Sequence, residues 1–146
     1  MPLPAIWGPK LWAVLHGIGA RAGKSIPQTR RDEERELKWL FEHLETIVPC
    51  PECRQHIMLY RKEHPPPEKG AEYGKWIWQF HEAVNMRLGK PSVAWMDGLG
   101  NSVTLAKAWA EFQNCLKDSL LKGSVRGDLV TKWRMHMQLW QGFSGC

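Results

Sequence analysis

Apolar side chains recur at intervals of three and four residues along most of this chain, and that spacing restricts its fold more than any other feature. A strand needs alternation at every second residue, and almost no segment has it. The Asp97-Gly98 pair has no alternating residues on either side, so it indicates a turn in a loop rather than a hairpin. The pattern therefore predicts an all-α fold.

Prolines and glycines divide the periodic pattern into helical segments. One helix is expected to start at a capping box, Thr29–Asp32, and to be closed by Pro49. The connector 64–67 contains three prolines and cannot be helical, and the Gly/Ser tail 142–146 is expected to be mobile. The other expected helices lie near residues 6–21, 51–62, 71–88, 102–122 and 128–141.

Two of the expected helices carry a second face beside the one that packs in the core. In the first helix, Trp12 and His16 lie one turn apart and outside the main apolar stripe. An ordinary core does not require such a face, so these helices are candidates for a binding site. In the helix over 71–88 the core stripe is Tyr73, Ile77, Phe80 and Val84, and the second stripe is Trp78, His81, Asn85 and Leu88.

Composition limits the class of protein. A chain of 146 residues with 43% hydrophobic and 24% charged residues has the make-up of one soluble globular domain. No apolar run is long enough to cross a membrane, and the N-terminus lacks the regions of a secretory signal. The net charge of +5 is spread without a Lys/Arg block, so we expect neither a nucleic-acid partner nor a membrane.

The segment with the most specific chemistry is Pro49-Cys50-Pro51-Glu52-Cys53-Arg54-Gln55-His56. Pro51 suits the first turn of a helix because its φ is fixed and it has no N–H to satisfy. Cys50 would then lie at the N-terminal edge, where free N–H groups and the helix dipole stabilise a thiolate. Cys53 follows one turn later, close enough for a disulfide, so we interpret Cys50 and Cys53 as a catalytic redox pair.

The same two cysteines also suit half of a zinc site, with His56 and His64 as the nearest further ligands. No second Cys-x-x-Cys or His-x-His pair is present, and zinc ribbons and fingers usually include β-hairpins. The βαβ context of a thioredoxin-like site is missing as well. A non-enzymatic helical module that binds zinc or a partner therefore remains the alternative to a redox enzyme.

Three motifs on the expected helices occur in a telling order: Trp7-Gly8-x3-Trp12-x2-Leu15-His16, Pro49-Cys50-x2-Cys53-x2-His56 and Trp78-x2-His81-x2-Val84-Asn85-x2-Leu88-Gly89-Lys90-Pro91. Together they resemble the Erv/ALR family of FAD-dependent sulfhydryl oxidases. The resemblance covers about residues 6–97. It implies an FAD-binding oxidase domain over 1–97, with a C-terminal helical extension over 98–146 packed on the same domain.

The family fold is a four-helix bundle around FAD, so the resemblance implies this bundle with extra C-terminal helices. Trp12 and His16 would line the adenine and pyrophosphate part of the flavin site, and His56 would lie beside the redox pair. His81, Asn85 and Lys90 would contact the ribose, adenine or phosphates. The full set that would hold the non-covalent FAD is Gly8, Trp12, His16, His56, Trp78, His81, Val84, Asn85, Leu88 and Lys90.

The resemblance also gives the two cysteines different roles. Cys53 would be proximal to flavin C4a, and Cys50 would be the exposed thiol that exchanges with substrate. A thiolate of a reduced protein would attack Cys50 in the Cys50–Cys53 disulfide, and a second thiol would release the oxidised product. Two electrons would then pass from Cys53 through FAD to dioxygen, giving hydrogen peroxide.

Some positions depart from the family's pattern. Where Trp78 and Trp95 stand, family members usually have the two cysteines of a structural disulfide. We expect the two indoles to pack together near the adenine in its place. Glu82 follows His81 where the family has an asparagine, so no contact of that asparagine is carried over to this chain.

Two cysteines lie outside the redox motif. Cys146, in the Gly/Ser tail, is the better candidate for a shuttle thiol that relays electrons, although it has no close partner. Cys115 is expected to be a buried, inert thiol, and a Cys115–Cys146 bridge within or between subunits is the other possibility. The apolar stripes of residues 98–146 suggest a dimer interface or a substrate platform.

Disulfide formation inside a cell suggests either mitochondria, in the intermembrane space, or a virus that assembles particles in the cytoplasm. Because the chain shows no targeting extension, we expect a viral member of the family that acts in the host cytoplasm or the virion. Its expected partners are reduced protein thiols, dioxygen and a second copy of the chain.

Overall fold

The computed structural model describes residues 4–145, which form helices joined by loops. Two short 3-10 helices, η1 (Leu44–Ile47) and η2 (Gly70–Glu72), lead into α3 and α4. Because this part of the chain contains no strand, the all-α prediction is confirmed. The α-helices are α1 (Pro4–Arg21), α2 (Pro27–Glu42), α3 (Pro51–Glu63), α4 (Tyr73–Leu88), α5 (Leu105–Leu121) and α6 (Gly127–Ser144).

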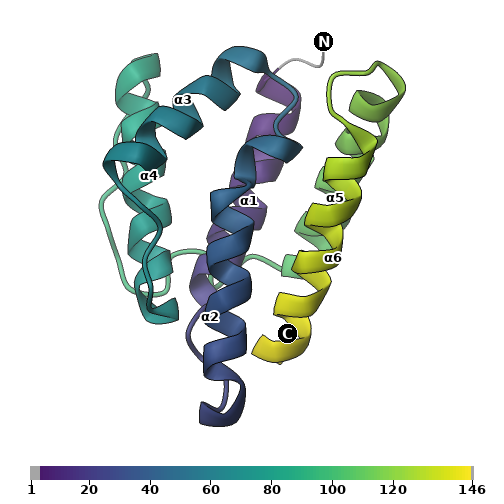
Figure 1. Ribbon diagram of the computed structural model, residues 1–146. Helices are drawn as coiled ribbons and strands as arrows, with labels where there is room; N and C mark the ends of the chain where they lie inside the picture. The colour runs from purple at the N-terminus through teal and green to yellow at the C-terminus, as the bar shows by residue number, and fades with distance from the viewer. Residues whose placement is uncertain (1–3, 146) are drawn as a thin grey trace.

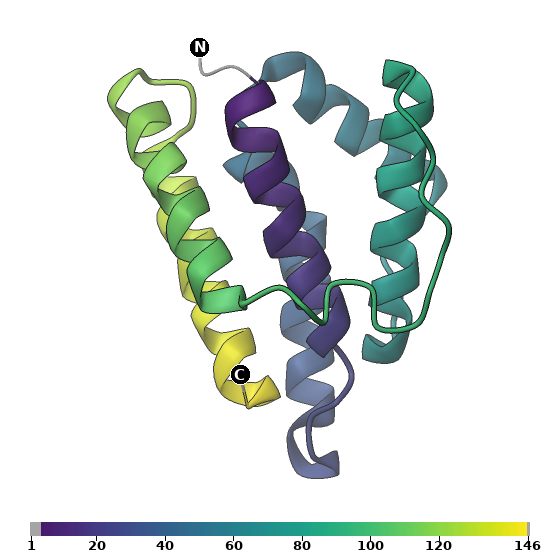
Figure 2. The ribbon, with the colours of Figure 1, turned by 180° about the vertical axis from the view of Figure 1, so that it is seen from behind.

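α1 and α2 lie at the centre, with the other helices on either side of them (Figure 1). α4 packs against α1 from one side, while α5 packs against α1 and α6 against α2 from the other. α3 crosses one end of the assembly and leads from α2 to α4. The connection 89–104 passes along α4 and then across α1 before it enters α5 (Figure 2). No helix in the described range is long and apolar enough to cross a membrane.

One hydrophobic core extends between these helices. Burial of a large apolar side chain stabilises the folded state by roughly 1.5–3 kcal/mol relative to leaving that side chain in water. The buried aromatic residues therefore supply much of the stability of the fold. The apolar faces of α5 and α6 lie in this same core, so these helices are joined to the other four through buried side chains. Aromatic residues with no more than 1% exposure are Phe41, Tyr73, Phe112, Trp133 and Trp140.

The predicted capping box at Thr29–Asp32 is wrong. α2 begins earlier, at Pro27, and Ile26 before it makes no side-chain capping bond. Proline is well suited to this first position because the N–H it lacks would have no partner in the helix. Thr29 Oγ1 instead donates to the carbonyl oxygen of Phe143, 3.0 Å away at the end of α6.

Two predicted helix ends are wrong as well. α2 stops at Glu42, and the chain tightens into η1 before it reaches Pro49. α6 continues to Ser144, so residues 142–144 are helical rather than part of a mobile tail. Contacts with α2 explain this extension, since Arg35 lies over the Phe143 ring, with its guanidinium carbon 5.9 Å from the ring centroid.

A buried carboxylate joins α2 to α6. Glu33 has no exposure to solvent and accepts hydrogen bonds from three donors. These are Trp140 Nε1 at 2.9 Å, Ser25 Oγ at 2.8 Å and the Gly23 N–H at 3.1 Å. A carboxylate is tolerated in the interior only with such partners, so Glu33 specifies how α6 and the α1–α2 turn meet α2.

A second acidic residue of α2 repeats this arrangement one turn later. Glu36 is 5% exposed, and its Oε2 lies 2.5 Å from His136 Nδ1 of α6. The indole of Trp39 stacks on the His136 imidazole, with ring centroids 3.7 Å apart, and on His43 at 4.0 Å. The α2–α6 interface therefore combines polar and stacking contacts that only one register of the two helices allows.

We predict that Glu33→Ala lowers the free energy of unfolding by about 2–4 kcal/mol, because three buried donors lose their acceptor at once. Urea denaturation followed by circular dichroism measures this loss. Glu68→Ala is the matched control: Glu68 pairs with Lys38 at 2.6 Å but its side chain is 79% exposed. The control should change stability by less than about 0.5 kcal/mol, and equal effects of the two substitutions would contradict the prediction.

Candidate active site

The Cys50–Cys53 pair lies at the start of α3. Cys50 is the N-cap, with extended backbone angles (φ −134°, ψ 113°), and Pro51 is the first helical residue. The Cys50 Sγ accepts a hydrogen bond from the backbone N–H of Cys53 at 3.2 Å. The thiol thus satisfies one of the N–H groups that a helix N-terminus leaves without an intrahelical partner. The predicted position of the pair on the helix is confirmed.

The exposures of the two thiols differ from expectation. Cys50 is only 7% exposed, whereas Cys53 is half-buried. Residues 47–50 are all buried where the chain passes from η1 into α3, and Cys50 is the last of them. The prediction that Cys50 is the exposed thiol is therefore wrong for this structure, in which Cys50 and Cys53 are both free thiols.

Burial raises the pKa of Cys53 to about 11, and the hydrogen bond and charge of Cys50 act in the same direction. The positive charge of Arg87, near the end of α4, lowers this pKa and so favours the thiolate. Cys53 is consequently a neutral thiol at pH 7. The sequence motifs did not identify Arg87, whose influence depends on how α4 lies relative to α3.

Trp12, His16 and His81 form one cluster between α1 and α4. The Trp12 indole stacks on the His81 imidazole, with ring centroids 3.8 Å apart and an interplanar angle of 7°. His16 Nε2 and His81 Nδ1 lie 2.9 Å apart and share a hydrogen bond. The structure thus brings together three residues that the sequence placed on the second faces of two separate helices.

The imidazoles of this cluster are uncharged at pH 7. Burial lowers the pKa of His81 to about 4, and the charge of His16 acts in the same direction. Burial also lowers the pKa of His16. Two neutral rings can share one hydrogen bond, with one nitrogen as donor and the other as acceptor. A half-buried surface of flat, uncharged rings suits a planar heterocycle.

Packed rings connect this cluster to the helix that carries the redox pair. The Phe80 ring lies 5.3 Å from Trp12 and 5.0 Å from Tyr60, measured between centroids. Tyr60 is on α3, about two turns after Cys53. Both Cys53 and Val84 pack against the same core. A series of ring contacts therefore links the aromatic cluster to α3, the helix that begins at the thiol pair.

The remaining candidates on α4 differ in exposure. Asn85 is 7% exposed, and its Nδ2 donates to Glu82 Oε1 at 3.4 Å. Leu88 is 52% exposed, and Lys90 lies exposed in the loop that follows. In this structure Asn85 is thus held inside the fold, whereas Leu88 and Lys90 face solvent.

His56 lies on α3 and Gly8 on α1. His56 follows Cys53 on α3, and its Nε2 is 3.7 Å from Glu52 Oε1. A Cβ built on Gly8 meets no atom within 4 Å, so this glycine borders open space. Within residues 4–145 no three His, Cys, Asp or Glu side chains converge as metal ligands. The zinc site considered as the alternative is therefore not formed by Cys50, Cys53 and His56.

Trp78 and Trp95 pack together, as predicted, with ring centroids 5.8 Å apart. Trp78 Nε1 also donates to the Val93 carbonyl at 2.7 Å. Glu82 accepts hydrogen bonds from the Val93 N–H at 2.9 Å and from the Ser92 hydroxyl, and these bonds lower the pKa of Glu82. The glutamate that departs from the family's pattern thus holds the loop after α4 against the helix.

The same connection also closes over His16. Gly100 has a φ of 93°, and a Cβ at this position would lie 2.3 Å from the His16 carbonyl oxygen. Only glycine allows this approach. Arg21 Nη2 donates to the Val103 carbonyl at 2.6 Å and fixes the far end of the loop on α1. Sequence reasoning did not identify Gly100 or Arg21, since the glycines near residue 98 indicated only a turn.

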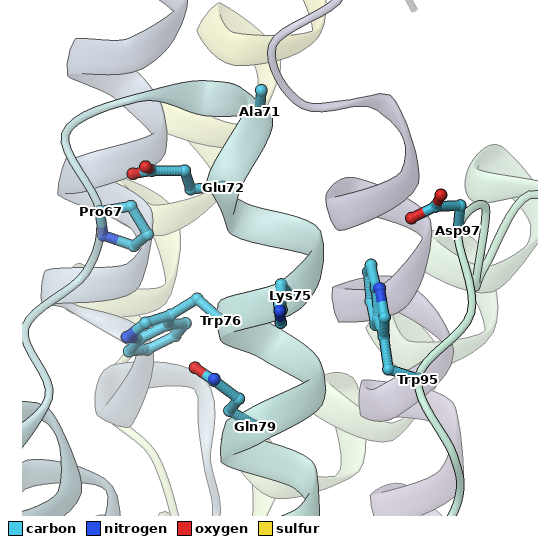
Figure 3. Close-up of a pocket in the computed structure, with 8 residues that line it drawn as sticks. All are labelled: Pro67, Ala71, Glu72, Lys75, Trp76, Gln79, Trp95 and Asp97. Atoms are coloured by element: carbon cyan, nitrogen blue, oxygen red, sulfur yellow. The ribbon is translucent and has the colours of Figure 1, made fainter.

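A surface pocket of about 490 Å³ lies near the start of α4, away from the redox pair. Figure 3 shows Trp76 and Trp95 on opposite sides of the helix, with Lys75 between them. Glu72 and Asp97 add carboxylates to its lining. Neither cysteine of the redox pair lines this pocket, so we do not assign it to the thiol chemistry.

The two cysteines outside the motif remain without an assigned role. Cys115 is partly buried on α5 and packs against the core as a free thiol. Its backbone carbonyl accepts a hydrogen bond from Ser119 Oγ at 3.2 Å. Cys146 lies outside the described residues, so the predicted shuttle and the Cys115–Cys146 bridge stay predictions.

We predict that the rate of alkylation of Cys53 by iodoacetamide rises with pH up to about 11, because only the thiolate reacts and burial disfavours it. Arg87→Gln should shift this dependence to still higher pH, since it removes the charge that favours the thiolate. Mass spectrometry of peptides labelled over a pH series measures both effects. Lys62→Gln, on the same helix as Cys53, is the control, and an unchanged profile in Arg87→Gln would contradict the prediction.

Comparison with known proteins identifies the relatives of this chain. The model of the Erv1 / Alr family matches residues 9–117, a range that continues past residue 97 into α5. An FAD-linked sulfhydryl oxidase of African swine fever virus (isolate Pig/Kenya/KEN-50/1950) is 28% identical over 130 residues, which cover 87% of this chain and 95% of the viral protein. No solved structure matches significantly.

Cellular relatives align over a shorter range. The mitochondrial FAD-linked sulfhydryl oxidase ERV1 of Saccharomyces cerevisiae is 30% identical over 99 residues, 62% of this chain and 51% of the yeast protein. The FAD-linked sulfhydryl oxidase ERV1 of Oryza sativa subsp. japonica is 33% identical over 85 residues, 58% of this chain and 42% of the rice protein. Since the family model spans most of the chain, including the thiol pair and the aromatic cluster, the chain belongs to the Erv1/Alr family.

Proposed function

We propose that this protein is an FAD-dependent sulfhydryl oxidase that converts protein dithiols to disulfides, with dioxygen as acceptor and hydrogen peroxide as product. The observation that carries the proposal is the Cys50–Cys53 pair at the start of α3, a helix that ring contacts through Tyr60 and Phe80 link to the Trp12–His81 stack. Membership of a family whose relatives are named FAD-linked sulfhydryl oxidases supports it.

The residues of the region fit a flavin nucleotide. Trp12 and His81 offer flat faces, and the neutral imidazoles of His81 and His16 offer a donor and an acceptor for hydrogen bonds. Lys90, exposed beyond α4, provides a cation for phosphate. Further candidate contacts are Gly8, His56, Trp78, Val84, Asn85 and Leu88. When bound, FAD supplies the two-electron chemistry that thiols alone cannot pass to dioxygen.

The chain's own residues carry out thiol–disulfide exchange. In the oxidised enzyme, a substrate thiolate attacks Cys50 Sγ, the Cys50–Cys53 bond breaks, and Cys53 leaves as a thiolate. A second substrate thiolate attacks the mixed disulfide, so the substrate disulfide forms and Cys50 is released. The enzyme then holds two electrons and two protons as a dithiol. Because Cys50 is 7% exposed in the dithiol structure, attack at this atom requires a local movement that exposes its sulfur.

The expected setting follows from the same function. We infer that the substrates are reduced proteins and that two copies of the chain associate. The enzyme acts in the cytoplasm of a host cell or in the virion. The alignment with viral sulfhydryl oxidases over 95% of their length supports a viral type of enzyme.

The proposed function predicts a yellow protein that releases FAD on denaturation and consumes oxygen when a reduced protein dithiol is added. Cys53→Ala should reduce oxygen consumption to the uncatalysed background while it keeps the bound flavin, because the dithiol can no longer form a disulfide. An oxygen electrode and the flavin absorbance spectrum measure the two properties. Cys115→Ala is the control and should retain activity. Colourless protein that carries zinc would refute the proposal.

The packing of Trp78 on Trp95 predicts a role in flavin retention. Trp78→Ala or Trp95→Ala should weaken FAD binding about tenfold, roughly 1.4 kcal/mol, because an aromatic pair that fixes the loop against α4 is lost. The FAD released through a desalting column, quantified by fluorescence, measures the effect. Trp109→Phe, on α5, serves as the control for tryptophan loss. Wild-type flavin content in both alanine variants would show that the pair is not needed.

A further inference from the structure

We propose that Arg54 is a positioning residue that fastens the segment before the redox pair to the α5–α6 turn and thereby holds Cys50 against Cys53. The inference rests on the proposed function, because it concerns the same thiol pair. Arg54 directly follows Cys53 in α3, where a side chain that curls back reaches the start of the helix.

The contacts of Arg54 join three separate parts of the chain. Its Nη1 donates to the Val48 carbonyl at 2.7 Å and to the Ser124 carbonyl at 3.1 Å. Its backbone N–H donates to the Cys50 carbonyl at 2.9 Å. One residue therefore connects the entry to the motif, the N-terminal turn of α3 and the C-terminal helical pair.

Both carbonyls accepting from the guanidinium lie outside the helices. Val48 precedes the N-cap Cys50 by two residues and has extended backbone angles (φ −102°, ψ 115°). Ser124 follows Gly123, whose φ of 71° ends α5. Hydrogen bonds from a charged donor are stronger than neutral ones, so Arg54 adds a restraint to two irregular segments at carbonyls that lie outside the helices.

The restraint acts on the geometry of the thiols. The charge that favours the Cys53 thiolate is that of Arg87, so the two arginines have separable effects. When residues 48–50 are held in place, the Cys50 Sγ keeps its hydrogen bond from the Cys53 N–H. Formation of the disulfide then costs less conformational entropy than it would from a freely moving segment. Arg54 therefore favours the Cys50–Cys53 disulfide over the open dithiol.

The test measures the thiol–disulfide equilibrium of the full chain in glutathione buffers. In this exchange glutathione disulfide takes two electrons and two protons from the Cys50–Cys53 dithiol, and two glutathione molecules and one protein disulfide result. Arg54→Met removes the Nη1 atom that donates both hydrogen bonds and keeps the aliphatic stem, whereas Arg54→Lys keeps the charge and a smaller donor. Arg126→Met is the matched control, because Arg126 lies beside the same turn, is 73% exposed and pairs with Asp128.

Arg54→Met should lower the equilibrium constant for disulfide formation about tenfold, a potential about 30 mV less negative. Arg54→Lys should recover part of the loss, and Arg126→Met should match the wild type. Hydrogen exchange followed by mass spectrometry should become faster in Arg54→Met at residues 48–53 and at 121–126 together, since the same bonds hold both segments.

A wild-type equilibrium constant in Arg54→Met would overturn the proposal. Faster exchange spread evenly over all helices would also overturn it, because Arg54 would then serve general stability. The measurement needs no oxidase turnover. If the wild-type protein consumes no oxygen, the proposed function fails, while the effect of Arg54 on the thiol pair is still read directly.

Discussion

The stack of Trp12 on His81 is the contact on which the candidate site depends, because it joins α1 to α4 across the space where the two second faces meet. The hydrogen bond between His16 and His81 fixes the relative rotation of the same helices. Phe80 and Tyr60 continue the packing to α3, the helix that carries the thiol pair. If α1 and α4 slid by one turn, the flat surface and its neutral imidazoles would be lost together.

The C-terminal helices share the core with the rest of the chain and also reach the redox motif. α5 and α6 cover α1 and α2, and the buried carboxylate of Glu33 ties α6 into place through Trp140. Their turn then contacts the guanidinium of Arg54, next to Cys53. Through Arg54, a helical pair far from the thiols in sequence thus contacts the segment that leads into Cys50.

Much of the helical frame was predictable because it depends on local spacing. The apolar stripes of α5 and α6 and the helix opened by Pro51 appear in the structure, and Trp12, His16 and His81 of the second faces meet. The helix ends were less predictable. Thr29 was assigned to a capping box, yet it bonds Phe143 of α6, and residues 142–144 are helical because α2 supports them. Such contacts join positions more than a hundred residues apart, which no local pattern contains.

The sequence by itself determined the helical class, the chemistry of the thiol pair and the residue types of an aromatic site, because these depend on spacing within single helices. The tertiary structure alone decided which thiol is covered, how the imidazoles pair and which residues hold the loops. Gly100 and Arg54 contact backbone atoms of segments far away along the chain, and the sequence does not show which backbone atoms a residue will meet. The burial of Cys50 has the same origin, since it depends on how the segment before α3 folds against the core.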